Sequence, residues 1–139
     1  MMDAVALRLH PQQDLKAELE AFVQAQELEA ACVITGVGSL TQAVLRFAGQ
    51  PNGILLKEKF EIVSLTGVMS RHGSHYHVSI ADSTGRTLGG HVMPGCLIYT
   101  TAEIIIGILP QLSFRREPDT LTGYRELVIY PKPNDHPKC

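Results

Sequence analysis

Residues 69–91 have the sequence MSRHGSHYHVSIADSTGRTLGGH, which contains four of the six histidines of the chain. From position 75 onward, the apolar residues Tyr76, Val78 and Ile80 alternate with polar ones. Because successive side chains of a strand point to opposite faces of a sheet, this period of two predicts a strand with one apolar and one polar face. His75 and His77 are then expected on the same polar face.

The residues that follow this strand predict a hairpin. Asp82 and residues 83–85 suit a three-residue loop in which the glycine takes the left-handed position. Counting outward from that loop places His77 directly opposite His91 on the returning strand. Directly opposed residues have Cβ atoms roughly 5 Å apart and diagonal ones about 7–8 Å. We therefore expect His75 to share one patch with the other two histidines.

Three imidazoles in one patch predict a divalent-metal site with His75, His77 and His91 as ligands. Zinc is the first candidate, since open zinc sites use three protein ligands and leave a fourth position for water or a ligand. Gly89, opposite Ser79 on the same face, is expected to leave the floor beside the histidines bare. The alternative is an ordinary solvated sheet face, and a one-residue slip at the glycine pair would break the convergence.

Composition favours one globular domain. The chain has 139 residues, of which we assign residues 1–130 to the domain and residues 131–139 to a mobile C-terminal tail. A net charge of −2 argues against binding phosphate backbones by charge alone. The cysteines are widely spaced, without a CxxC motif, as is typical of a reducing compartment. With neither a signal-peptide pattern nor a bilayer-spanning apolar run, we expect a cytoplasmic protein without membrane association.

Elsewhere the pattern predicts one helix and several strands. The helix is expected from residue 15 to about 29, because Asp14 is a suitable N-cap and apolar residues recur at three- and four-residue spacing. Strands are expected at residues 5–9, at 30–40 up to a glycine-bearing bend, at 41–48, at 54–69 with a bulge, and at 97–109. Residues 114–130 predict two last strands, or a strand and a loop.

The segment 97–109 is nearly continuous in hydrophobicity, which predicts a central strand buried on both faces. Glu103 is the one ionisable residue within it. A carboxylate there is costly unless it is hydrogen-bonded, paired, or faces a metal or pocket. Two interpretations stay open. Glu103 lies at a wet subunit rim or in a local salt bridge, or it is a catalytic candidate, as a general base beside a metal-bound water or as a partner of a histidine.

Short motifs from the opening of the chain to residue 124 point to one known family. They are LHP at 9–11, VGSL at 37–40, LRFA at 45–48, FEIVSLTG at 60–67, GSHYH at 73–77, GGH at 89–91, YTTAE at 99–103, FRRE at 114–117 and TGY at 122–124. Together they resemble the PPC domain, the plants and prokaryotes conserved domain, which accompanies AT-hook motifs in plants.

The resemblance implies an α+β fold, with an antiparallel sheet flanked by one main helix, similar to the fold of acetolactate decarboxylase. It also implies a homotrimer assembled through sheet edges and the long apolar strand. The histidines at positions 75, 77 and 91 match those that carry a metal in some prokaryotic members of the family.

The AT-hook core Arg-Gly-Arg-Pro, which carries minor-groove binding in the plant proteins, is absent from this sequence. Our leading hypothesis is therefore a standalone PPC-domain protein, a DNA-associated or regulatory homotrimeric module with a three-histidine metal site. We expect any association with DNA to be weak or mediated by a partner. The alternative is a metal-dependent enzyme or small-molecule-binding protein that uses the same site without binding DNA.

Overall fold

The computed structural model describes residues 1–132 and contains one α-helix and nine β-strands in that range. The helix is α1 (Leu15–Ala25). The strands are β1 (Asp3–Leu9), β2 (Ala31–Arg46), β3 (Ile54–Leu56), β4 (Phe60–Met69), β5 (His75–Ala81), β6 (Thr87–Val92), β7 (Leu97–Ile108), β8 (Leu112–Pro118) and β9 (Arg125–Pro131). The α+β class predicted from the sequence is confirmed.

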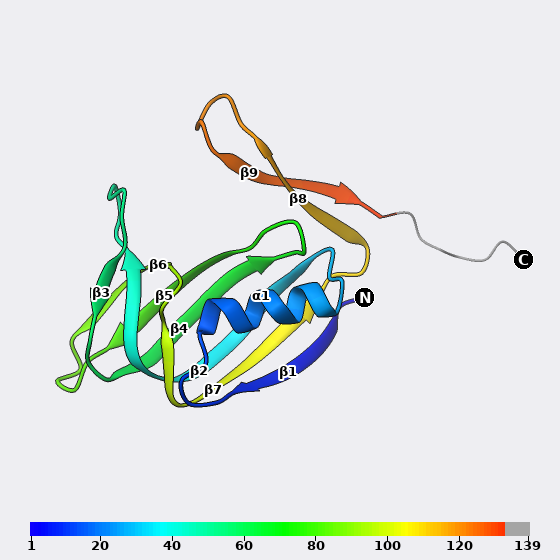
Figure 1. Cartoon of the computed structure of the whole chain (residues 1–139). Coiled ribbons are helices and arrows are strands. Elements are labelled where there is room, and N and C mark those ends of the chain that lie inside the picture. Colours follow the sequence, from blue (N-terminus) through cyan, green and yellow to red (C-terminus); the bar gives the residue numbers. More distant parts are fainter. Residues whose placement is uncertain (133–139) are drawn as a thin grey trace, which may run out of the picture.

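Seven strands form one antiparallel sheet in the order β1-β7-β2-β4-β5-β6, with β3 paired to β2. The sheet also curls, because the last residues of β2 pair with β6: Leu45 lies opposite Val92, and Arg46 lies opposite His91. Strands β8 and β9 form a separate hairpin that stands apart from the sheet (Figure 1). The expected antiparallel sheet with a single flanking helix is therefore the observed architecture.

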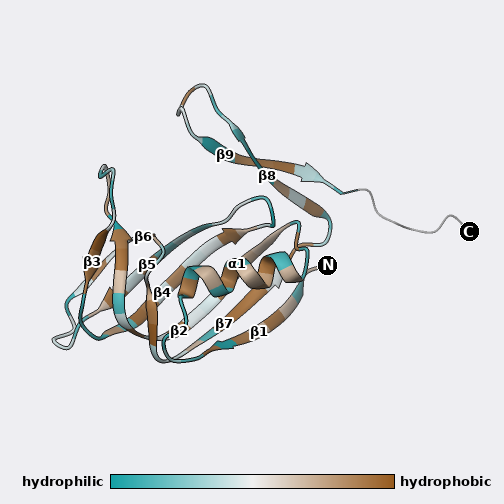
Figure 2. Ribbon diagram, in the orientation of Figure 1, coloured by the Kyte–Doolittle hydropathy of each residue, from teal (hydrophilic) through white to brown (hydrophobic). Residues whose placement is uncertain are grey.

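Helix α1 lies across one face of the sheet (Figure 1) and buries Leu15, Leu19 and Val23. Figure 2 shows apolar residues along the strands beneath it, whereas the turns are largely hydrophilic. Asp14 caps the helix as predicted, since its Oδ1 accepts a hydrogen bond from the Ala17 amide at 3.0 Å. The face under the helix is consequently the hydrophobic core.

The helix is shorter than the sequence predicted, because it ends at Ala25 and not near residue 29. Glu27 adopts a positive φ of 49°. Its amide donates to the Gln24 carbonyl at 3.1 Å, and the Leu28 amide donates to the Val23 carbonyl at 3.0 Å. These two bonds form a Schellman motif, which is usually built on glycine and is therefore hard to recognise when glutamate occupies the left-handed position. As a result, Glu29 lies outside the helix.

Residues 30–48 do not form the two predicted strands. They form the single 16-residue strand β2, whose pairing with β7 shifts register near Val33, Gly38 and Leu40. A Cβ at Gly38 would lie 2.2 Å from the Thr101 carbonyl oxygen, so only glycine allows this close approach of β2 and β7. The glycines therefore mark bulges within a continuous strand, where the sequence had suggested a bend between two strands.

The segment 54–69 forms β3 and β4, and the bulge predicted there is confirmed as a shift in the pairing with β5 between Ile62 and Ser64. Strand β7 departs from expectation, because it is buried on one face only. Ile98, Ala102, Ile104 and Ile106 are buried, whereas Tyr99 and Glu103 are exposed in the single chain. The reason is that α1 covers one side of the sheet and, within residues 1–132, no second layer covers the other.

Of the two interpretations of residues 114–130, the structure has the pair of strands, β8 and β9. The backbone of Phe114 helps to attach this hairpin to the main body: its amide donates to the Glu29 carbonyl at 2.8 Å, and Ser70 Oγ donates to its carbonyl at 2.9 Å. Of the predicted tail, Pro131 ends β9, while residues 133–139 lie outside the described range. In the part of the chain that the structure describes, no helix is long and apolar enough to cross a bilayer.

Candidate metal centre

The hairpin formed by β5 and β6 has the predicted register. His77 lies opposite His91, Val78 opposite Gly90, and Ile80 opposite Leu88. The loop is fixed by Asp82, whose Oδ1 accepts hydrogen bonds from the Thr84 amide at 2.8 Å and from the Arg86 amide at 3.0 Å. Gly85 takes the left-handed position, with a φ of 82°. Local turn chemistry therefore sets which residues face each other along the hairpin.

The two faces of β5 differ as the alternation predicted. Tyr76, Val78 and Ile80 are buried against the core. His75 and His77 point the other way and are exposed, while His91 on β6 is partly buried. A one-residue slip would exchange the two faces, so burial of the apolar set holds the histidines in place.

The three histidines converge as expected. The Nε2 atoms of His75 and His77 lie 3.0 Å apart, and the ring of His91 has its centroid 4.9 Å from that of His75 and 5.7 Å from that of His77. One ring nitrogen of each residue lies within 4.8 Å of those of the other two. The cluster therefore has the arrangement that a metal site requires, while the alternative of a solvated polar face stays open.

The donor set fits a divalent ion. Nitrogen ligands bind zinc at about 2.0–2.1 Å, so two of them on a tetrahedral ion are roughly 3.3 Å apart. The 3.0 Å separation of His75 Nε2 and His77 Nε2 is close to this value. Small rotations of the exposed rings of His75 and His77 would let them share one ion with His91. Within the described residues no carboxylate belongs to the cluster, so a fourth position would remain open to solvent or a ligand.

The protonation of these rings also favours metal binding. Burial, together with the nearby charges of His75 and Arg46, lowers the pKa of His91 to about 4. Burial and the neighbouring His77 lower the pKa of His75 as well. Both imidazoles are therefore neutral at physiological pH, and the neutral form is the one that donates a lone pair to a metal.

Two neighbours shape the floor of the site. Gly89 lies opposite Ser79, as predicted, and a Cβ added at Gly89 would lie 2.6 Å from the Val78 carbonyl oxygen. Glycine is thus required at position 89 for the close approach of β5 and β6. It also leaves the polar face bare beside the histidines. Arg46, opposite His91 across the β2–β6 pairing, brings a guanidinium to the same side of the sheet.

Glu103 is not brought to the histidines in the single chain. It lies on β7, opposite Arg8 of β1 and Val37 of β2, and strands β2 and β4 separate it from β5 in the sheet order. Because the side chain is exposed, the burial cost that singled it out from the sequence does not arise within one chain. Its catalytic role stays a prediction.

Sequence reasoning missed a second polar cluster, centred on Glu29. This carboxylate accepts a hydrogen bond from Ser113 Oγ at 2.7 Å and contacts His72 Nε2 at 3.3 Å and Arg115 at 3.5 Å. The separations along the chain are 43 residues for His72, 84 for Ser113 and 115 − 29 = 86 for Arg115. No local periodicity links such positions, so the sequence held no signal beyond the basic residues at 115 and 116.

The family model of the Plants and Prokaryotes Conserved (PCC) domain, also abbreviated PPC, matches residues 1–110. The chain belongs to this family. The resemblance to the PPC domain inferred from short motifs is thereby confirmed. The match includes α1, the whole main sheet and all three histidines of the cluster.

The similar proteins include curated relatives, compared by sequence, and solved structures. The bifunctional protein GlmU of Synechococcus sp. (strain JA-2-3B'a(2-13)) is 51% identical over 129 residues, which are 93% of this PPC chain and 20% of that protein. The chain thus spans about a fifth of the length of the curated relatives that it matches at this level. Among solved structures, a hypothetical protein from Salmonella is 44% identical, with a TM-score of 0.93 over 95% of this chain and 96% of its own.

A second solved structure is described as a metal-containing protein from Archaeoglobus fulgidus. It is 26% identical to this chain, with a TM-score of 0.78, and the match covers 91% of this chain and 93% of that one. The main sheet and its helix are therefore shared by bacterial and archaeal relatives.

The metal-free protein is expected to lose stability as the pH falls from about 6.5 toward 4. In this window the unfolded chain binds a proton at residue 91, whose ordinary pKa is 6.5, while folded His91, with a pKa of about 4, does not. Unfolding therefore becomes easier as the pH falls, and the effect ends below the folded pKa.

Melting temperatures measured in chelator across this pH range test the prediction. The decrease in melting temperature between pH 6.5 and pH 4 should be smaller in His91→Gln than in the wild type. The matched control is His10→Gln, which removes a histidine outside the cluster and should behave as the wild type does. Equal drops in all three proteins would contradict the account of His91.

Proposed function

We propose that this PPC chain is a divalent-metal-binding module that holds its ion, zinc in the first instance, on His75, His77 and His91. The observation that carries the proposal is the convergence of three ring nitrogens within 4.8 Å of one another on a hairpin of fixed register. The metal-containing description of the Archaeoglobus relative supports it. The ion would present an open coordination position to a ligand.

Binding is favoured over catalysis for this site. A general base must lie within hydrogen-bond reach of the proton that it removes, either directly or through one water. Glu103, the acidic candidate, lies on β7, and strands β2 and β4 lie between β7 and β5 in the sheet. A metal-dependent enzyme remains the second candidate, because an open coordination position can also activate water or a substrate.

We further propose that the chain acts as a homotrimeric regulatory module, and that any association with DNA is weak or mediated by a partner. The sequence lacks the AT-hook core, and its net charge is −2. Proteins that bind duplex DNA by themselves usually present clustered Lys and Arg side chains to the phosphates. A partner or a fused segment would therefore supply the contacts with DNA.

The exposed face of the main sheet supports the trimer. Val37 on β2 and Val63 on β4 are 55% and 58% exposed, and both lie on the sheet face opposite α1, together with Tyr99 and Glu103 of β7. Contiguous apolar side chains on a solvent-facing sheet are typical of an interface. In such an assembly Glu103 would lie within or beside the contact, as one interpretation of the sequence had it.

Two finer expectations belong to the same proposal. The similarity of the fold to acetolactate decarboxylase stays a prediction. A cytoplasmic location is supported by Cys32 and Cys96, which are free thiols in the described range, as expected of a reducing compartment.

Removing one ligand should release the metal. Protein purified without a histidine tag is expected to contain about one divalent ion per chain, and His77→Ala should weaken its retention by at least about tenfold, since two imidazoles alone do not make a closed site. Elemental analysis by mass spectrometry after dialysis measures this. His10→Ala is the matched control and should retain the ion. Metal-free wild type, or equal metal in both variants, would contradict the proposal.

The trimer is tested by placing a charge on the exposed sheet face. Val63→Asp should convert a trimer to monomers, because a carboxylate buried at an interface without a partner is strongly unfavourable. Sedimentation velocity gives the mass of each species. Leu121→Asp, at a position 95% exposed in the β8–β9 turn, is the control and should stay trimeric. A monomeric wild type, or a Val63→Asp protein that remains trimeric, would exclude this interface.

A further inference from the structure

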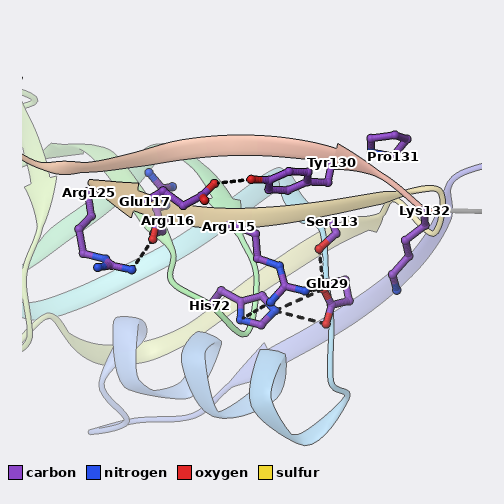
Figure 3. A pocket seen from close by; sticks show the side chains of 10 residues that line it. All are labelled: Glu29, His72, Ser113, Arg115, Arg116, Glu117, Arg125, Tyr130, Pro131 and Lys132. Carbon is purple, nitrogen blue, oxygen red and sulfur yellow. Dashed lines mark hydrogen bonds and ion pairs between the residues drawn. The ribbon is translucent and has the colours of Figure 1, made fainter. Parts of the chain in front are cut away.

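A cleft of about 840 Å³ lies between the β8–β9 hairpin and the main body of the chain. Figure 3 shows Glu29 and His72, from the loops that precede β2 and β5, on one side, and residues of β8 and β9 on the other. The lining shares no residue with the three-histidine cluster. This cleft is therefore a separate feature of the fold.

The base of the cleft is the carboxylate of Glu29, whose side chain is only 11% exposed. It accepts a hydrogen bond from Ser113 Oγ at 2.7 Å and forms an ion pair with Arg71, whose Nε lies 2.7 Å away. It also contacts His72 and Arg115. The hydrogen bond from Ser113 is the main reason why the pKa of Glu29 lies below its ordinary value. Glu29 is thus ionised, and its charge is already balanced by two arginines.

His72 lies between this carboxylate and Arg115. Nη1 of Arg115 lies 3.2 Å from His72 Nδ1, and because a guanidinium only donates, Nδ1 must accept. The other ring nitrogen, Nε2, faces Glu29 at 3.3 Å. The guanidinium of Arg115 is consequently fixed in the cleft by both neighbours.

Positively charged residues outnumber negatively charged ones in the lining of the cleft. Arg115, Arg116, Arg125 and Lys132 face two carboxylates, Glu29 and Glu117. Glu117 accepts a hydrogen bond from Tyr130 Oη at 2.7 Å.

Among the described residues, Arg116, Arg125 and Lys132 form no ion pair. Within residues 1–132, the one polar side-chain contact of these three residues is the hydrogen bond that Arg125 Nη2 donates to the Arg116 carbonyl at 2.6 Å. The cleft therefore carries an excess of positive charge that no contact among residues 1–132 explains.

We propose that this cleft binds a small anion with at least two phosphate or carboxylate groups. Guanidinium groups bind both oxyanions through paired hydrogen bonds, and Lys132 would add a point charge. The volume lies in the range of pockets for small molecules, about 300–1,000 Å³. A concave site of this size suits a metabolite better than the extended backbone of a duplex.

The charges can be removed without disturbing how the hairpin is held. The hairpin is attached through Phe114, Ser70 and Glu29, which do not depend on the side chains of Arg116 or Lys132. The double variant Arg116→Gln/Lys132→Gln keeps polar side chains of similar length. Lys57→Gln/Arg86→Gln removes the same charge at two exposed positions outside the cleft and is the matched control.

Isothermal titration calorimetry with inorganic pyrophosphate and with citrate at low salt tests the proposal. We expect the wild type and the control to bind at least one probe with equal affinity, and the cleft variant to bind it at least about tenfold more weakly, since each charged hydrogen bond is worth more than about 1.4 kcal/mol. Melting curves of the three proteins verify that each is folded.

His77→Ala separates the cleft from the metal centre, since both probes also bind metals. If the probe still binds His77→Ala, it does not reside on the ion. The proposal is overturned if neither probe binds at millimolar concentration, if the cleft variant and the control weaken equally, or if only His77→Ala abolishes binding. It is equally overturned if the cleft variant loses retention on duplex DNA but keeps its affinity for the probes.

Discussion

The pairing of β5 with β6 is the constraint on which the candidate metal centre depends. Three hydrogen bonds to one oxygen of Asp82, together with the left-handed Gly85, close the loop in a single register. Burial of Tyr76, at 1% exposure, fixes which side of the strand faces the core. The turn and the burial of Tyr76 thus favour the same register. The histidines converge because this register places them on one face of the hairpin.

The sequence predicted the parts of the structure that are set by nearby residues. The register of the hairpin, the Asp14 cap and the bulge in β4 follow from turn residues and periodicity. Features set across the fold were missed. The end of α1 depends on a left-handed glutamate, Glu27, and one side of β7 is exposed because the described part of the chain has no second layer there. The Glu29 cluster joins positions that only the folded chain brings together.

The loop between β4 and β5 connects the two sites. Ser70 Oγ accepts a hydrogen bond from the His72 amide and donates to Phe114 of the hairpin, while the Arg71 amide donates to the Leu28 carbonyl. Three residues after His72, the same backbone enters β5 at His75. A short segment, held by hydrogen bonds to the main body and to the hairpin, therefore links the cleft to the candidate metal centre.

The most direct test of the account is an anomalous-difference map from crystals of untagged protein, recorded at the zinc absorption edge. The account predicts one peak per chain, about 2.0–2.1 Å from a ring nitrogen of His75, His77 and His91. No peak there, an ion bound elsewhere, or rings that point to different sides of the hairpin would contradict it.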